Sequence, residues 1–166
     1  MVWGIRAGRR PASYRAGMTT LRLAELTPDN LPAAVEMPLK PGQDKHVASV
    51  VMSVAEAYVN PTAWPRVVLD GEEVVGFVMG NFDADNDIPA FRAGIWRLNV
   101  HADAQGRGVG RFAVEQVAAE ARARGFSRIT VLWVPGEDGP EGFYLKVGFV
   151  PTGEEMFGQK IGVLDL

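Results

Sequence analysis

Residues 105–110 read Gln-Gly-Arg-Gly-Val-Gly and lie between an expected strand, residues 95–100, and an amphipathic helix. Three glycines within six residues allow the backbone to adopt positive φ and to turn successive N–H groups toward one point. The helix that follows adds its own unpaired amides and the positive end of its dipole at the same place. The sequence therefore predicts an anion site at this turn, most simply for a phosphate or pyrophosphate.

The composition is that of one globular domain without thiol chemistry. The chain has 166 residues, 47% of them hydrophobic, and a chain of this length buries roughly two thirds of its unfolded surface. It has no cysteine, which excludes disulfides, thiol nucleophiles and thiolate metal ligands, and its two histidines alone do not make a zinc cluster. No apolar run approaches the length of a membrane span. A cytoplasmic protein without a bound metal is the simplest expectation.

Charge is unevenly distributed along the chain. Residues 1–17 contain Arg6, Arg9, Arg10 and Arg15 and no acid, so the remainder has 13 basic and 20 acidic side chains. An acidic body argues against nucleic acid and acidic substrates, and it is compatible with a cationic small molecule or simply with solubility. Residues 1–17 also have no helical period and no signal-peptide core. We expect a disordered extension over residues 1–17 and a single domain over residues 18–166, with Met18 as its functional start.

The remaining pattern alternates short strands and helices. The expected strands are residues 20–23, 66–69, 73–79, 95–100, 127–134 and 162–166. The expected helices begin at Thr27, span residues 42–58, follow the glycine loop to Arg124, and span residues 141–147. Asp70-Gly71 supplies the positive φ of a tight hairpin turn. The apolar face of the helix over residues 42–58 is expected to consist of Val47, Val50, Val51, Val54 and Tyr58. This order predicts an α+β domain with a mixed sheet flanked by helices.

Two common glycine-loop folds do not fit these residues. A P-loop NTPase needs Lys and then Ser or Thr after the last glycine, where this chain has Arg111 and Phe112. A Rossmann domain needs a wider glycine spacing and an acid about 20 residues further on. At that distance this chain has Ser127, Arg128 and Ile129.

The glycine loop resembles the acetyl-CoA motif of the GNAT superfamily of N-acetyltransferases, Gln/Arg-x-x-Gly-x-Gly/Ala, through Gln105, Gly108 and Gly110. Residues 143–149, Phe-Tyr-Leu-Lys-Val-Gly-Phe, resemble the second signature of that superfamily, a tyrosine on a short helix followed by Gly-Phe. The two motifs occur in the family order, and the resemblance covers residues 20–166. It implies a mixed, mostly antiparallel central sheet flanked by helices, and an enzyme that transfers acetyl from acetyl-CoA to a primary amine.

The resemblance also assigns roles to residues. It implies that Tyr144 protonates the departing CoA thiolate as a general acid. It implies main-chain amides that hold the pyrophosphate, and a strand end that pairs with the pantetheine arm and polarises the thioester carbonyl. The cofactor-binding residues are then Leu98, Asn99, Val100, Gln105, Gly106, Arg107, Gly108, Val109, Gly110 and Arg111, and no metal site is expected. One departure is Glu137, which stands where relatives often carry Asn soon after the position of Pro135.

Within the superfamily the chain is most similar to bacterial spermine/spermidine (diamine) acetyltransferases. The similarity rests on residues 26–30 (Leu-Thr-Pro-Asp-Asn), 47–49 (Val-Ala-Ser), 70–71 with 75–79 (Val-Gly-Phe-Val-Met), and 95–98 (Ile-Trp-Arg-Leu). It implies a polyamine acceptor such as spermidine or spermine, and neither a nucleic acid nor a membrane partner. The oligomeric state stays open, with a homodimer as one option. An aminoglycoside, a protein amino terminus and a non-catalytic acyl-CoA-binding module remain alternatives, although such a module needs no tyrosine.

The acceptor amine needs a proton acceptor that the sequence does not identify. An alkylammonium with a pKa near 10.4 is neutral about one time in a thousand at pH 7.4, so its deprotonation costs about 4 kcal/mol. Glu36, Glu56 and the acids of residues 83–87 are candidates by charge alone. We expect His46 to lie on the surface and Trp96 to pack within the sheet.

Overall fold

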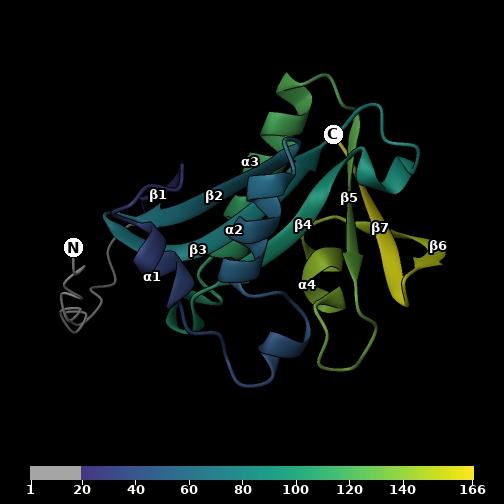
Figure 1. Ribbon diagram of the computed structural model, residues 1–166. Coiled ribbons are helices and arrows are strands. Elements are labelled where there is room, and N and C mark those ends of the chain that lie inside the picture. The colour runs from purple at the N-terminus through teal and green to yellow at the C-terminus, as the bar shows by residue number, and fades with distance from the viewer. Residues whose placement is uncertain (1–19) are drawn as a thin grey trace.

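The computed structural model describes residues 20–166, and the expected extension over residues 1–17 lies outside this range. The strands are β1 (Leu21–Ala24), β2 (Ala63–Asp70), β3 (Glu73–Phe82), β4 (Ala93–Val100), β5 (Arg128–Trp133), β6 (Val150–Met156) and β7 (Gln159–Asp165). The helices are α1 (Leu31–Val35), α2 (Val50–Val59), α3 (Val109–Ala123) and α4 (Glu141–Lys146), with 3-10 turns η1 (Gln43–Lys45), η2 (Pro89–Phe91) and η3 (Ala102–Ala104). Together they form one sheet with helices on both faces (Figure 1), which confirms the predicted α+β class.

The strand order of the sheet is β1-β2-β3-β4-β5-β7-β6, and every neighbouring pair is antiparallel except β4 and β5. These two parallel strands pair only at Gly94 with Thr130 and at Ile95 with Val131. A Cβ atom at Gly94 would lie 2.5 Å from the carbonyl oxygen of Thr130, so glycine permits this close approach. Beyond it the strands diverge, and Figure 1 shows them well separated at their C-terminal ends. The sheet is therefore open between the C-terminal halves of β4 and β5.

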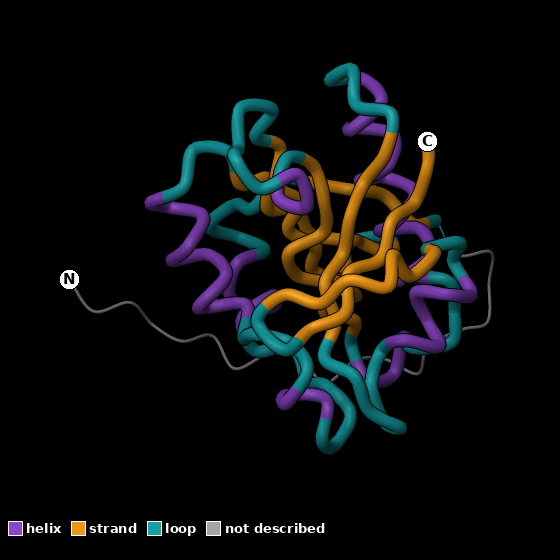
Figure 2. Tube along the Cα trace, turned by 90° about the vertical axis from the view of Figure 1, so that its right-hand side faces the viewer, coloured by secondary structure: helices purple, strands orange, loops and turns teal. Residues whose placement is uncertain are grey.

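The two faces of the sheet carry separate apolar cores. Val68 and Val78 pack on the α3 side, whereas Phe77 and Met79 pack on the side of α1 and α2. This alternation follows from the two-residue period of strands. Figure 2 shows the strands as a central layer between helices.

Several elements agree with the sequence predictions. The hairpin of β2 and β3 turns at Gly71, which has φ +60°. The strand before the glycine loop, the helix after it, the next strand and α4 are all present. The helix α3 ends at Ala123, and Gly125, with φ +86°, is the left-handed residue that follows its C-cap.

The prediction of one helix over residues 42–58 is wrong at its start. Gly42 has φ +84° and is followed by the short turn η1, and α2 begins only at Val50. The hydroxyl of Ser49 accepts a hydrogen bond from the backbone N of Met52 (3.2 Å), so Ser49 is the N-cap. The expected apolar face is also wrong in part, because Val51 and Tyr58 are exposed whereas Val50 is buried.

Two further differences concern polar or exposed segments. The helix expected from Thr27 begins at Leu31, because residues 27–30 form a turn in which the Thr27 hydroxyl accepts from the backbone N of Asn30 (3.3 Å). The sequence does not predict the strand β6, and β7 begins three residues earlier than expected. Almost every residue of β6 is exposed, so this edge strand lacks the apolar alternation by which strands are recognised.

Candidate active site

A cavity of about 690 Å³ lies where β4 and β5 diverge. Its lining includes, from the α3 side, Val100, Gln105, Gly106, Gly110, Phe143 and Tyr144, and, from the α2 side, Asp44, Lys45, His46, Trp96 and Arg97. A bulge in β4 leaves Trp96 without a partner residue on β3, so that Trp96 and Arg97 both project toward the α2 side. The cavity is thus reached from both faces of the sheet.

The glycine loop adopts the backbone that the sequence predicts. Gly106 has φ +81° and Gly108 has φ +88°, and a Cβ atom at either position would meet no atom within 4 Å. Gly108 is the N-cap of α3 and provides no side-chain cap. The amides of the first helical turn lie outside the intrahelical hydrogen bonds, which leaves them able to bind an anion.

The side chain of Gln105 holds the glycine loop in place. Its Nε2 donates to the carbonyl oxygen of Val100 (3.1 Å) and to Oε1 of Gln43 (2.7 Å), and Nε2 of Gln43 donates back to Oε1 of Gln105 (3.1 Å). The loop is therefore tied both to the end of β4 and to η1. Gly110 packs closely, because a Cβ atom there would lie 3.0 Å from the ring of Phe143.

Three other loop residues expected at the cofactor contact the surrounding structure. Val109 is buried in the core on the α3 side. Arg107 lies 3.9 Å from the carboxylate of Asp70, and Arg111 donates to the carbonyl oxygen of Lys146 (3.1 Å) at the end of α4. None of these three residues lines the cavity, whereas Gln105, Gly106 and Gly110 of the same loop do.

The end of β4 presents Leu98 and Val100 to the cavity. The side chain of Asn99 is buried on the opposite face, where its Nδ2 donates to the carbonyl oxygen of Ala48 (3.3 Å). Since β5 no longer pairs with β4 here, the backbone of residues 98–100 borders the opening.

Tyr144 on α4 is brought to the same cavity. Its ring stacks on Trp133, with centroids 5.5 Å apart and an interplanar angle of 23°, and it makes edge contacts with Phe143 and Phe149. The residue is 7% exposed, and this burial raises the pKa of the Tyr144 hydroxyl above its usual value. The hydroxyl therefore keeps its proton at neutral pH.

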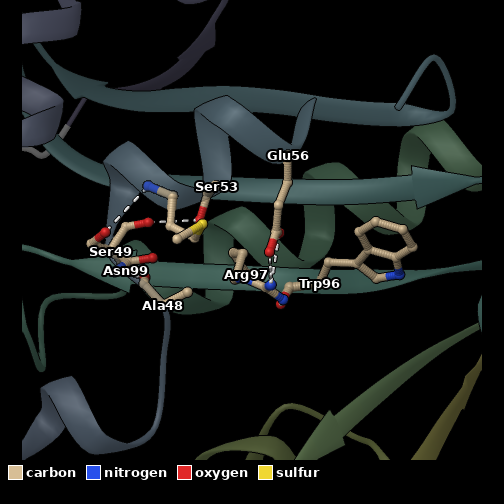
Figure 3. A network of polar contacts seen from close by, with 8 residues as sticks. Ala48, Ser49, Ser53, Glu56, Trp96, Arg97 and Asn99 are labelled. Atoms are coloured by element: carbon tan, nitrogen blue, oxygen red, sulfur yellow. Dashed lines mark hydrogen bonds and ion pairs between the residues drawn. The ribbon is translucent and has the colours of Figure 1, made fainter. Parts of the chain in front are cut away.

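An ion pair occupies the α2 side of the cavity. Nη2 of Arg97 donates to both carboxylate oxygens of Glu56, at 2.7 and 3.0 Å, and Nη1 donates to the carbonyl oxygen of Trp96 (2.8 Å). Figure 3 shows the guanidinium pointing at Glu56 from β4. Trp96 packs edge-on against Phe91, as expected for a packing residue, but it also lines the cavity.

The acids proposed from sequence as proton acceptors do not line the cavity. Glu36 is exposed at the end of α1, Glu56 is paired with Arg97, and the acids of residues 83–87 lie in the loop after β3. His46 does line it, contrary to the expectation of a surface position. The sequence signals for this were Gly42 and Ser49, which mark residues 43–48 as a loop between a turn and a helix N-cap.

Metal sites and membrane-spanning helices were also considered for the described residues. Among residues 20–166, no three or more histidine or acidic side chains are grouped so as to hold a metal ion. None of the helices in that part of the chain has the length and apolar character needed to cross a membrane.

Comparisons with known proteins were consistent with this geometry. Solved structures with the same fold include an acetyltransferase from Thermus thermophilus, with 24% identity and a TM-score of 0.65 over 89% of this chain and 97% of that one. The GNAT domain of S. lividans PAT has 18% identity and a TM-score of 0.70, covering 88% and 90% of the two chains. A protein described as a streptothricin acetyltransferase, from Bacillus anthracis str. Ames, was solved with acetyl coenzyme A; it has 16% identity and a TM-score of 0.66 over 90% and 99%.

At these identities the solved structures show the fold. No curated protein sequence matches the chain significantly. A family model described as the acetyltransferase (GNAT) family matches residues 21–149, which is most of the chain. The protein therefore belongs to the acetyltransferase (GNAT) family and is an acetyl-CoA-dependent N-acetyltransferase.

Proposed function

We propose that acetyl-CoA binds along the glycine loop and into the opening between β4 and β5. The observation that carries this proposal is the start of α3, where a left-handed glycine replaces a capping side chain beside the cavity that Tyr144 lines. The amides of residues 105–111 hold the pyrophosphate, because oriented N–H groups and a helix dipole favour an anion. The backbone of Leu98, Asn99 and Val100 binds the pantetheine arm, since it borders the gap in the sheet.

Tyr144 is the general acid in this proposal. The acceptor nitrogen attacks the thioester carbonyl, the carbon–sulfur bond breaks, and the thiolate takes the hydroxyl proton of Tyr144. The position of Tyr144 at the cavity supports this role, and because burial disfavours a tyrosinate, the hydroxyl must regain a proton as it gives its own to the thiolate. The absence of cysteine favours direct transfer between the two bound substrates.

The acceptor is a primary amine, and we propose a polyamine such as spermidine or spermine. Two exposed acids, Asp44 and Asp138, lie at the cavity, and the charge of Arg97 is balanced by Glu56. A flexible polycation suits such a site, because its reacting nitrogen enters the cavity while its other ammonium groups meet the acids at the rim. Lys45 is also at the cavity, so we expect moderate electrostatic selection.

An acceptor panel with acetyl-CoA tests this function. We expect spermidine and spermine to be acetylated with higher kcat/KM than a simple alkylamine, an aminoglycoside or a peptide amino terminus. Their KM should rise between low and high ionic strength, since exposed charges are screened by salt. A simple alkylamine or a peptide that reacts as well as spermidine, or a KM that salt leaves unchanged, would contradict the polyamine assignment and leave the acetyl transfer in place.

A further inference from the structure

The proposed reaction still requires a group that takes a proton from the acceptor ammonium. We propose that His46 is this group, with Nε2 as the accepting atom, an inference that rests on the proposed function. His46 lines the cavity, as do Trp96 and Arg97, whose side chains lie on the α2 side. In the proposed function the acceptor occupies this part of the cavity.

The two ring nitrogens of His46 are in different environments. Nδ1 is buried and has no hydrogen-bond partner among the described residues, which leaves Nε2 as the accessible nitrogen. The group that takes a proton from the ammonium must present a lone pair to it, and Nε2 is the nitrogen of His46 that can do so from the cavity.

The backbone around His46 is joined to the two elements that we propose to bind acetyl-CoA. The backbone N of His46 donates to the carbonyl oxygen of Gln43 (3.0 Å), and the side chain of Gln43 is paired with Gln105 of the glycine loop. Two residues further on, the carbonyl oxygen of Ala48 accepts from Asn99 on β4 (3.3 Å). The segment that carries the imidazole is thus attached to the glycine loop and to the strand proposed to bind acetyl-CoA.

Other charged groups at the cavity are less suited to this role. Asp44 and Asp138 are exposed, and Glu56 is held by Arg97. Imidazole is the side chain whose ordinary titration lies nearest neutral pH, so it accepts a proton more readily than a solvated carboxylate. Lys45 and Arg97 are cationic at neutral pH and do not accept one.

Two side chains, His46 and Tyr144, account for both protons that the acceptor nitrogen loses. An acceptor ammonium loses two protons when it becomes an amide. The first passes to Nε2 of His46 before attack and leaves to solvent after the product dissociates. The second leaves the nitrogen as the carbon–sulfur bond breaks and restores the Tyr144 hydroxyl, whose own proton has gone to the thiolate.

The test compares wild type with His46→Gln over a range of pH, using whichever amine of the panel the wild type acetylates. The ratio of the two kcat/KM values cancels the titration of the amine itself. We expect the ratio to rise to about 100-fold or more as pH increases from 5 to 8, the range in which histidine loses its charge. A purely structural role for His46 gives a ratio that does not change with pH, and that result would overturn the proposal.

Other charged or titratable residues line the cavity with His46. They are Asp44 and Lys45 on its own segment, Arg97 on β4, which is paired with Glu56 of α2, and Asp138 and Tyr144 near α4. Asp44→Asn compared with wild type in the same way should give a ratio that does not change with pH, because His46 is present in both proteins. If the ratio changes with pH for Asp44→Asn and stays constant for His46→Gln, the carboxylate is the proton acceptor and the proposal is wrong.

His101 gives a matched control, because it is the other histidine of the chain and does not line the cavity. His101→Gln should retain the wild-type pH profile.

The His46→Gln variant should bind acetyl-CoA and unfold in denaturant as wild type does. If that variant does not fold, His46→Ala with added imidazole replaces it. Recovery of at least tenfold in rate with imidazole supports the proposal, and no recovery contradicts it. A wild type that acetylates no amine would refute the proposed function and this inference together, whereas an active wild type with an unchanging ratio refutes only the inference.

Discussion

The two longest helices of the described residues begin beside the same cavity, but their first turns are built in opposite ways. The helix α2 starts at Ser49, whose hydroxyl accepts a hydrogen bond from the third residue of the helix. The helix α3 starts at Gly108, which is in the left-handed conformation and has no side chain to cap the first turn. The first turn of α2 is stabilised by the chain itself, whereas that of α3 is available to a ligand.

The same contrast extends to the side chains on each face of the opening. On the α2 side, Arg97 and Glu56 neutralise each other, and their positions are fixed by three hydrogen bonds. On the α3 side, Tyr144 is held by ring packing, and no hydrogen bond to its hydroxyl is found among residues 20–166. In the function we propose, the α3 side serves the cofactor chemistry and the α2 side positions the acceptor.

The largest effect is expected from Tyr144→Phe on the α3 side. The ring keeps its stacking on Trp133, so acetyl-CoA affinity should stay within about threefold, whereas kcat should fall by roughly 10² to 10⁴ because the proton donor is gone. Steady-state kinetics and calorimetric titration with acetyl-CoA separate the two quantities. Phe143→Leu is the control, and it should mainly lower stability. A Tyr144→Phe enzyme with wild-type kcat from pH 6 to 9 would show that the thiolate leaves without this proton.

Gly108→Glu should weaken acetyl-CoA binding by about 100-fold or more, close to 3 kcal/mol, because a carboxylate would occupy the place of the pyrophosphate. Gly125→Glu is a matched control: Gly125 has φ +86°, close to the +88° of Gly108, and a Cβ atom at either position meets open space. Both variants carry the same backbone strain and the same added charge. Equal affinity losses in the two variants would show that strain in the fold, rather than a phosphate site at α3, causes the effect.

Tyr144 should also make the fold sensitive to alkali. The hydroxyl of an unfolded chain ionises near pH 10, whereas burial raises the pKa of Tyr144 in the folded protein. Above pH 10 the unfolded chain releases a proton that the folded protein retains, so stability should fall by up to about 1.4 kcal/mol per pH unit. Chemical unfolding of wild type and Tyr144→Phe from pH 8 to 11.5 measures this. Parallel curves for the two proteins would mean that the hydroxyl is not buried.

Ser49→Ala should lower the free energy of unfolding by about 1 kcal/mol, the usual contribution of a capping serine. Because the cap lies on the α2 side, where we propose that the acceptor binds, acetyl-CoA affinity should not change. Urea unfolding and cofactor titration on the same sample measure both. A clear loss of cofactor affinity with normal stability would contradict the separation of the two helix starts.

The features that sequence reasoning identified are those with strong local signals. The glycines of the loop and of the β2–β3 turn require a backbone that few other residues adopt, so Gly106, Gly108 and Gly71 mark their turns directly. The buried face of α3 recurs at helical spacing through Val109, Ala113, Val117 and Ala121, which fixes both its type and its length. These elements place the α3 side of the candidate site.

The α2 side depends on pairings that local patterns do not contain. The apolar run of residues 47–58 is compatible with one long helix. In the structure, the left-handed Gly42 and the N-cap Ser49 delay the start of α2 until Val50. The bulge at Trp96 and the divergence of β4 from β5 are set by strand partners far away in the chain. For this reason the sequence placed His46 on the surface, although the structure places it at the cavity.

The smallest effect is expected from removing the residues before Met18. Residues 1–17 contain four arginines and no acid, and their apolar residues follow no helical period, so we expect the truncated protein to unfold within about 0.5 kcal/mol of the full chain. Its acetyl-CoA affinity should also be unchanged, because the cofactor groups proposed above lie in residues 98–144. Denaturant unfolding and kcat/KM of both chains at equal ionic strength provide the measurement. A change confined to the KM of a polyamine would mean that the four arginines repel the acceptor, and a loss of more than about 2 kcal/mol would mean that the segment packs on the domain.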